Sequence, residues 1–155
     1  MRRAYPRWKG TDLMRRYLVV ANKTLGGDHL LATLQALARQ GPCSFHLLVP
    51  ATPPSDHLWT EGETQQIARK RLEQGLARFG ALGLDVDGEI GDANPILAIE
   101  DVLRTAPFDE IVLSTLPPGL SRWLKLDLPH RVETAFGLPV THVVSRRRSR
   151  AMKSA

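Results

Sequence analysis

The positions of apolar residues along the chain predict five strands. Short runs rich in leucine, isoleucine and valine are typical of buried strands. They occur at residues 16–22, 44–50, 84–91, 109–114 and 139–145. In the run at 84–91 apolar and polar positions alternate, which predicts a less buried strand at an edge of the sheet.

Between these runs, apolar residues recur at three- and four-residue spacing, which predicts amphipathic helices. They cover residues 26–41, 60–83, 94–106 and 129–137. The third helix has an Asn cap and a Pro at its first position, and the fourth begins with Pro and ends at Gly. Strands that alternate with helices over short connections indicate a doubly wound α/β fold, with a five-stranded parallel sheet and helices on both faces.

A sheet of this kind binds its ligand beyond the carboxyl ends of the strands, where the strand order reverses. If the order is 3-2-1-4-5, Asn22, Lys23 and Thr24 after the first strand face Ser114 and Thr115 after the fourth. The periodicity is equally compatible with a flavodoxin-like 2-1-3-4-5 order. The residues alone therefore leave the strand order open.

The charge distribution divides the chain into three parts. The net charge of +5 comes from the two ends, which are basic, whereas the residues between them carry more Asp and Glu than Lys and Arg. A nucleic-acid-binding domain carries its basic surface on the fold itself, so we expect no specific nucleic-acid binding; the ends can contact polyanions weakly. We predict a mobile basic leader at 1–15, one domain at 16–145 and a disordered basic tail at 146–155.

Other sequence features exclude several classes of protein. No apolar run approaches the roughly 20 residues of a membrane span, and Cys43, the one cysteine, excludes an intrachain disulfide, so we expect a cytoplasmic protein. The five histidines share no metal-ligand spacing with Cys43 or with acidic residues, and no metal site is predicted. Met14 repeats the initial Met-Arg-Arg just before the first strand, and we interpret it as a candidate start of the protein.

Motifs of the common catalytic classes are also missing. The chain has no G-x-S-x-G nucleophile elbow, Walker loop or G-x-G-x-x-G motif. We interpret Cys43, which directly follows a helix end, as a small packed side chain rather than a nucleophile. Gly91 and Asp92 precede the third helix, where they either form a turn and cap or let a ligand approach the backbone.

Several segments together resemble the universal stress protein family. They are YLVVANKTLGGDHLLATLQALA, EIGDANPILAIEDVL and EIVLSTLPPGLSRWLKLDLPHRVETAFGLPVTHVV, in this order around a long second helix, and the resemblance covers residues 16–145. It implies the Rossmann-like, adenine nucleotide alpha hydrolase-like fold with strand order 3-2-1-4-5. It also implies a homodimer through the last strand, 139–145, and a cleft between strands one and four that binds ATP in many members.

The ATP-binding pattern of the family, a strand-one Asp and the loop G-x2-G-x9-G-[ST], is altered in this chain. Asn22 stands where the Asp is expected, and Ser114 replaces the first glycine of the loop. Pro117 and Pro118 lack the N–H donors that a phosphate nest needs. Asp127, just before the fourth helix, would repel a phosphate there. We therefore expect no triphosphate binding in the family's usual mode.

The resemblance and the altered loop together predict a function. We expect a universal stress protein-like domain, non-catalytic, that binds a small polar or nucleotide-type ligand weakly or acts through dimerisation and partner binding in a stress response. Two alternatives stay open: an ATP- or AMP-binding protein with slow nucleotide hydrolysis, and an interaction module whose edge strand joins a partner's sheet. The predicted ligand-binding residues are Asn22, Lys23, Thr24, Val49, Gly91, Ser114, Thr115, Gly119, Ser121, Arg122 and Asp127.

Overall fold

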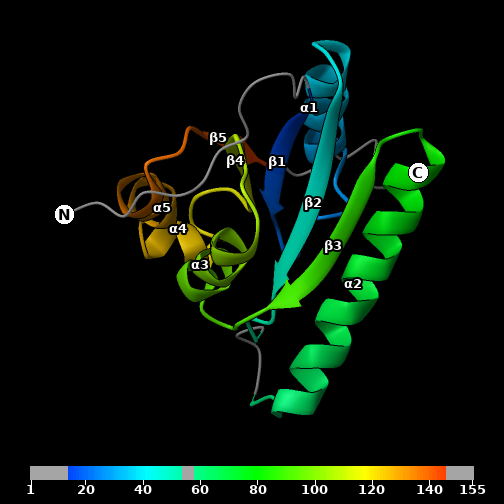
Figure 1. The fold of residues 1–155 in the computed structure, drawn as a ribbon. Helices are drawn as coiled ribbons and strands as arrows, with labels where there is room; N and C mark the ends of the chain where they lie inside the picture. Colours follow the sequence, from blue (N-terminus) through cyan, green and yellow to red (C-terminus); the bar gives the residue numbers. More distant parts are fainter. Residues whose placement is uncertain (1–13, 54–57, 146–155) are drawn as a thin grey trace.

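The five predicted strands form one parallel sheet in the order β3-β2-β1-β4-β5. The computed structural model describes residues 14–53 and 58–145, so most of the predicted leader and all of the predicted tail lie outside the described residues. The 3-2-1-4-5 order is confirmed and the 2-1-3-4-5 alternative is wrong, with β3 and β5 at the two edges (Figure 1). The strands are β1 (Arg15–Val20), β2 (Cys43–Pro50), β3 (Val86–Gly91), β4 (Glu110–Thr115) and β5 (Val140–Val144).

All four predicted helices are present, and a short fifth one was not predicted. The predicted ones are α1 (Asp28–Arg39), α2 (Glu61–Ala81), α3 (Pro95–Thr105) and α5 (Leu128–Phe136). The additional helix α4 (Arg122–Lys125) has 4 residues, too few to show a hydrophobic period. It begins at Ser121, whose side-chain oxygen accepts a hydrogen bond from the Leu124 N–H at 3.1 Å.

Helices α2 and α3 begin where the sequence provides caps. Thr60 and Glu63 form a capping box, in which each side chain accepts a hydrogen bond from the other residue's N–H, at 3.1 and 3.0 Å. At α3 the Asn94 side chain accepts from the Ile96 N–H at 2.9 Å, as expected. The Asp92 side chain accepts from the Asn94 N–H at 2.8 Å, so Asp92 has a turn role.

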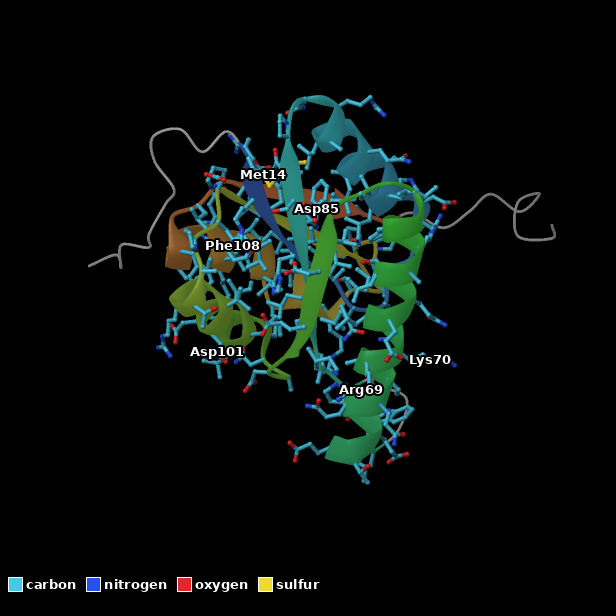
Figure 2. The ribbon with its side chains drawn as sticks, turned by 45° about the vertical axis from the view of Figure 1, so that its right-hand side comes forward. Met14, Arg69, Lys70, Asp85, Asp101 and Phe108 are labelled. Carbon is cyan, nitrogen blue, oxygen red and sulfur yellow. The ribbon has the colours of Figure 1, made fainter. Side chains whose placement is uncertain are left out.

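The helices cover the two faces of the sheet in pairs. Helices α1 and α2 pack on one face, and α3 and α5 on the other (Figure 1). Figure 2 shows this division, with Arg69 and Lys70 of α2 on one side of the sheet and Asp101 and Phe108 on the other. Side chains alternate between the two cores along each strand, so Val19 lies in the first core and Leu18 in the second. No helix in the described ranges is long and apolar enough to cross a membrane.

The first strand begins one residue before the predicted start at residue 16. Arg15 belongs to β1, where it pairs in register with Cys43, and its N–H donates to the Pro42 carbonyl oxygen at 3.1 Å. Arg15 also forms an ion pair with Glu110 of β4 at 3.5 Å. An arginine at the end of an apolar run gives no sequence signal for strand pairing, which explains the shift.

The packing of α3 on the sheet explains the glycine at position 91. A Cβ atom at Gly91 would lie 2.7 Å from the Cβ of Ala98 and 2.9 Å from Cδ1 of Leu48. Both distances are below normal van der Waals contact, so a side chain here would push α3 away from β3. Gly91 therefore permits close packing of the helix against the strand.

This packing predicts the effect of Gly91→Ala. We expect the free energy of unfolding, measured by urea denaturation, to fall by about 1–3 kcal/mol because the added methyl group overpacks the core. Gly62→Ala is the matched control, because a Cβ atom there has nothing within 4 Å. It should be neutral or slightly stabilising. Equal stability of the Gly91→Ala variant and the wild type would contradict this packing role.

Candidate ligand site

A cleft opens at the carboxyl ends of β1 and β4, at the reversal of the strand order. It holds about 540 Å³ of space, including the part open to solvent. Its walls come from the loops after β1 and β2, the end of β4, the loop from β4 to α4, and the middle of α2. Met14 and Asp85 in Figure 2 mark the amino ends of β1 and β3, so the cleft lies at the other end of the sheet.

A buried hydrogen bond joins the loop after β1 to the end of β4 at the base of the cleft. The hydroxyls of Thr24 and Ser114 lie 2.6 Å apart, although the two residues are 90 positions apart in the sequence. Thr24 is 5% exposed and Ser114 is 1% exposed. Because each hydroxyl satisfies the other away from water, the bond fixes the loop after β1 against the end of β4.

Asn22 holds three segments of the cleft wall together. Its amide nitrogen donates to the carbonyl oxygens of Pro50 and Thr52, at 2.9 and 3.5 Å. Its amide oxygen accepts a hydrogen bond from the Arg71 guanidinium. The side chain therefore ties β1 to the end of β2 and to α2, and it uses its own donors and acceptor to do so.

The Pro-Pro-Gly loop after β4 has a local structural explanation. The Pro117 carbonyl oxygen accepts hydrogen bonds from the N–H groups of Leu120 and Ser121, at 3.0 and 3.1 Å. Gly119 has a φ of 91°, and Pro118 precedes it, which is the residue pattern of a type II turn. Since both prolines lack an N–H and two further N–H groups bind Pro117, this loop is poorly suited to cradle phosphates.

The lining of the cleft is basic, in contrast to the acidic composition of the fold around it. Three cationic side chains line it, Lys23, Arg71 and Arg122, and the described lining contains no Asp or Glu. Partial burial lowers the pKa of Arg71 below its usual value, and a guanidinium stays charged nonetheless. Arg122 also donates to the Pro53 carbonyl oxygen at 3.1 Å, across the mouth of the cleft. The cleft therefore favours an anionic ligand.

Seven of the predicted site residues line the cleft and four do not. Val49 is fully buried in the core and Gly91 packs against α3. Gly119 forms the turn described above, and Asp127 is exposed at the start of α5, outside the described lining. The seven that line the cleft are Asn22, Lys23, Thr24, Ser114, Thr115, Ser121 and Arg122.

Among the described residues, six others line the cleft and are not in the predicted set. Thr52 and Pro53 follow β2, so the rule that ligands bind at carboxyl ends of strands could have found them. Arg71 lies in the middle of α2, and nothing in the sequence separates it from the other charged residues of that helix. Trp123, 7% exposed, belongs to the core beneath the cleft as well as to its wall. Leu116 and Leu120 are the remaining apolar residues of the cleft lining.

Cys43, the candidate nucleophile of the sequence, lies apart from this cleft. Cys43 is half-buried at the amino end of β2, where burial and the nearby Asp85 raise the pKa of its thiol, the opposite of what a nucleophile needs. Within residues 14–53 and 58–145, no group of three His, Cys, Asp or Glu side chains could hold a metal ion.

Solved structures of universal stress proteins have the same fold. No protein-family model matches this sequence, and no curated protein matches it at a significant level. A universal stress protein in complex with cAMP superimposes with a TM-score of 0.56 at 17% sequence identity, over 84% of this chain and 97% of that one. The universal stress protein from Archaeoglobus fulgidus in complex with dAMP gives a TM-score of 0.59 at 14% identity, over 84% and 97%. A further structure of a universal stress protein from Archaeoglobus fulgidus gives 0.53 at 15% identity, over 83% and 93%.

These likenesses confirm the fold that the sequence resemblance implied. The chain has the universal stress protein fold across nearly the whole of the compared proteins. At these identities the likeness concerns the fold alone. The function of the cleft has to be argued from its own residues.

The bond between Thr24 and Ser114 predicts a coupled effect on stability. Thr24→Val or Ser114→Ala should each lower the free energy of unfolding by about 1–3 kcal/mol, because each leaves a buried hydroxyl unpaired. The double variant should lose less than the sum of the two single losses. Thr33→Val removes a hydroxyl that binds the His29 carbonyl at the surface of α1 and serves as the control, with little change expected. Strict additivity of the two buried substitutions would show that the bond does not stabilise the cleft.

Proposed function

We propose that this chain is a non-catalytic domain with the universal stress protein fold that binds a small nucleotide with one phosphate group, weakly, in the cleft between β1 and β4. The observation that carries the proposal is the cleft itself, which has hydroxyl groups and three cations in its lining and lies at the strand reversal. A cytoplasmic location, expected from the sequence, and a role in a stress response, implied by the family resemblance, are further parts of this proposal.

The chemistry of the lining supports one phosphate better than three. Lys23, Arg71 and Arg122 can neutralise an anion. The Pro-Pro-Gly turn, however, offers few free N–H donors for a chain of phosphates. Two of the compared universal stress proteins were solved with cAMP and dAMP, and each of these ligands has one phosphate group. Because part of the cleft is open to solvent, the ligand stays partly hydrated, which favours weak binding.

The lining gives less support to the alternative of nucleotide hydrolysis. Hydrolysis of a phosphoanhydride needs a group that positions water and, usually, carboxylates that hold magnesium. The described lining has hydroxyls and cations but no carboxylate. We therefore favour a binding function for this cleft.

The edge strand β5 supports a second part of the proposal, a homodimer through residues 139–145. The Pro139 carbonyl oxygen accepts from the Ile111 N–H and the Ser145 N–H donates to Thr115, so the odd-numbered residues of β5 face β4. In a parallel strand the N–H and C=O groups of successive residues point in opposite directions, so those of the even-numbered residues of β5 point away from β4. Those of Val140, His142 and Val144 are thus available to a second sheet.

Calorimetric titration of the purified protein with AMP, ADP and ATP tests the ligand proposal. We expect AMP to bind at least as tightly as ATP, and the affinity to be independent of magnesium, because the second and third phosphates find no nest. Micromolar ATP binding that requires magnesium, or turnover of ATP above a buffer blank, would contradict the proposal.

Two surface variants extend this titration, one as a test of the cleft and one as its control. Lys23→Gln removes an exposed cation from the cleft lining and should weaken AMP binding about two- to fivefold, without affecting adenosine. Lys70→Gln removes an exposed cation of α2 that does not line the cleft. It should leave both affinities unchanged.

Val144→Pro tests the dimer. Proline at this position removes an N–H that points away from β4 and blocks the addition of a second strand, so sedimentation should show a monomer with a retained circular dichroism spectrum. Thr141→Pro is the control, because it removes an N–H that faces β4 and should destabilise the sheet itself. A substitution at Val143 would not test the dimer, because this residue is 8% exposed and part of the core, and changing it would disturb the fold itself. A wild-type monomer, or a dimer that survives Val144→Pro, would contradict this interface.

A further inference from the structure

A histidine on β5 is hydrogen-bonded to a residue of the cleft wall. The hydroxyl of Thr115 lies 2.8 Å from Nε2 of His142. Thr115 is 2% exposed, ends β4 and lines the cleft, whereas His142 is exposed overall and lies on the neighbouring strand. The pair therefore connects a titratable group with the hydroxyl of a residue that lines the cleft.

The direction of this hydrogen bond depends on the protonation of the ring. When Nε2 carries no proton, it accepts the Thr115 hydroxyl proton, and the threonine oxygen can then only accept from a ligand. When the ring is an imidazolium, Nε2 donates to the threonine oxygen, and the hydroxyl proton becomes free to turn to a ligand. The same hydroxyl is thus an acceptor toward the cleft in one state and a donor in the other.

The second state suits an anion better than the first. A phosphate oxygen accepts hydrogen bonds and needs a donor opposite it, and the imidazolium adds positive charge behind that donor. A neutral nucleoside gains little from the change, since its hydroxyl groups can either donate or accept.

The surroundings of His142 set its charge in the ligand-free protein. Partial burial lowers the pKa of His142 below its usual value of about 6.5, so the ring is neutral at pH 7 to 8. Strand β5 packs against β4, α1 and α5, and α4 lies beside α5. The charged and titratable side chains of these elements are Glu110, Asp28, His29, Arg39, Arg122, Lys125, His130, Arg131 and Glu133.

We propose that His142 is a positioning residue that links phosphate binding in the cleft to the uptake of one proton, by turning the Thr115 hydroxyl into a donor. This inference rests on the proposed function, because it concerns the same cleft and the same class of ligand. By reciprocity, a phosphate-bearing ligand raises the pKa of His142 when it binds, and its affinity rises as the pH falls.

cAMP is the appropriate probe, with adenosine as its uncharged counterpart. The phosphodiester of cAMP carries a single charge throughout pH 5.5 to 8, so any pH dependence of its binding comes from the protein. Titration calorimetry over this range should show cAMP binding about three- to tenfold tighter at pH 5.5 than at pH 8, the size of one net hydrogen bond. Adenosine should bind with constant affinity. Repeating the titration in buffers with different ionisation enthalpies counts the protons taken up.

Two variants and one spectroscopic measurement complete the test. His142→Gln keeps a donor and an acceptor but does not titrate, so cAMP affinity should become independent of pH. His130→Gln, an exposed histidine of α5 outside the cleft lining, should behave like the wild type. Nitrogen-15 spectra of the histidine rings should show an unprotonated Nε2 on His142 at pH 8 and a higher His142 pKa in the cAMP complex.

The outcomes separate this inference from the function on which it rests. If cAMP and adenosine both bind with pH-independent affinity, or if the pH dependence persists in His142→Gln, the inference is wrong and the proposed function stands. If neither ligand binds at any pH, the proposed function is wrong and the inference fails with it.

Discussion

A parallel strand can be joined to its neighbour only by a crossover, and such crossovers are right-handed. Because the chain moves outward from β1 through β2 to β3, helices α1 and α2 must cover one face of the sheet. To continue with β4 on the other side of β1, the chain returns over the opposite face through α3, and α5 follows there. The segments after β1 and β4 therefore leave the sheet toward opposite faces, and the cleft opens between them. The buried bond between Thr24 and Ser114 closes its base.

The hydrogen bonds inside the cleft decide what it can bind. Asn22 is fully engaged with β2 and α2, and the N–H groups of Leu120 and Ser121, which follow the Pro-Pro-Gly segment, donate to the Pro117 carbonyl oxygen. The groups of the described lining that can bind a ligand are hydroxyls and cationic side chains. One of these hydroxyls, that of Thr115, is hydrogen-bonded to His142. Such a lining suits one phosphate on a small nucleotide. The charge of the lining and the composition of the loop lead to the same conclusion by independent routes.

Most of the fold could be predicted from the sequence, because each element has a clear local pattern. The Asn94-Pro95 helix start and the apolar strand runs are examples, and the strand order followed from the resemblance to a known family. The lining of the candidate cleft could be predicted in part. Residues directly after β1 and β4 were found because topology alone places them together. Arg71 was missed because its place in the cleft depends on how α2 lies on the sheet. The role of Gly91 stays open in the sequence, because a glycine that permits close packing looks the same there as one that permits ligand approach.

The account depends most on the location of the ligand. Amide chemical shifts of nitrogen-15-labelled protein, recorded while AMP is added to saturation, test it most directly. We expect the shifts to change at residues 22–24, 52, 114–116 and 120–123, which line the cleft, with little change at the amino ends of the strands near Met14 and Asp85 (Figure 2). Changes confined to the amino ends, or no change at saturating AMP, would contradict the account.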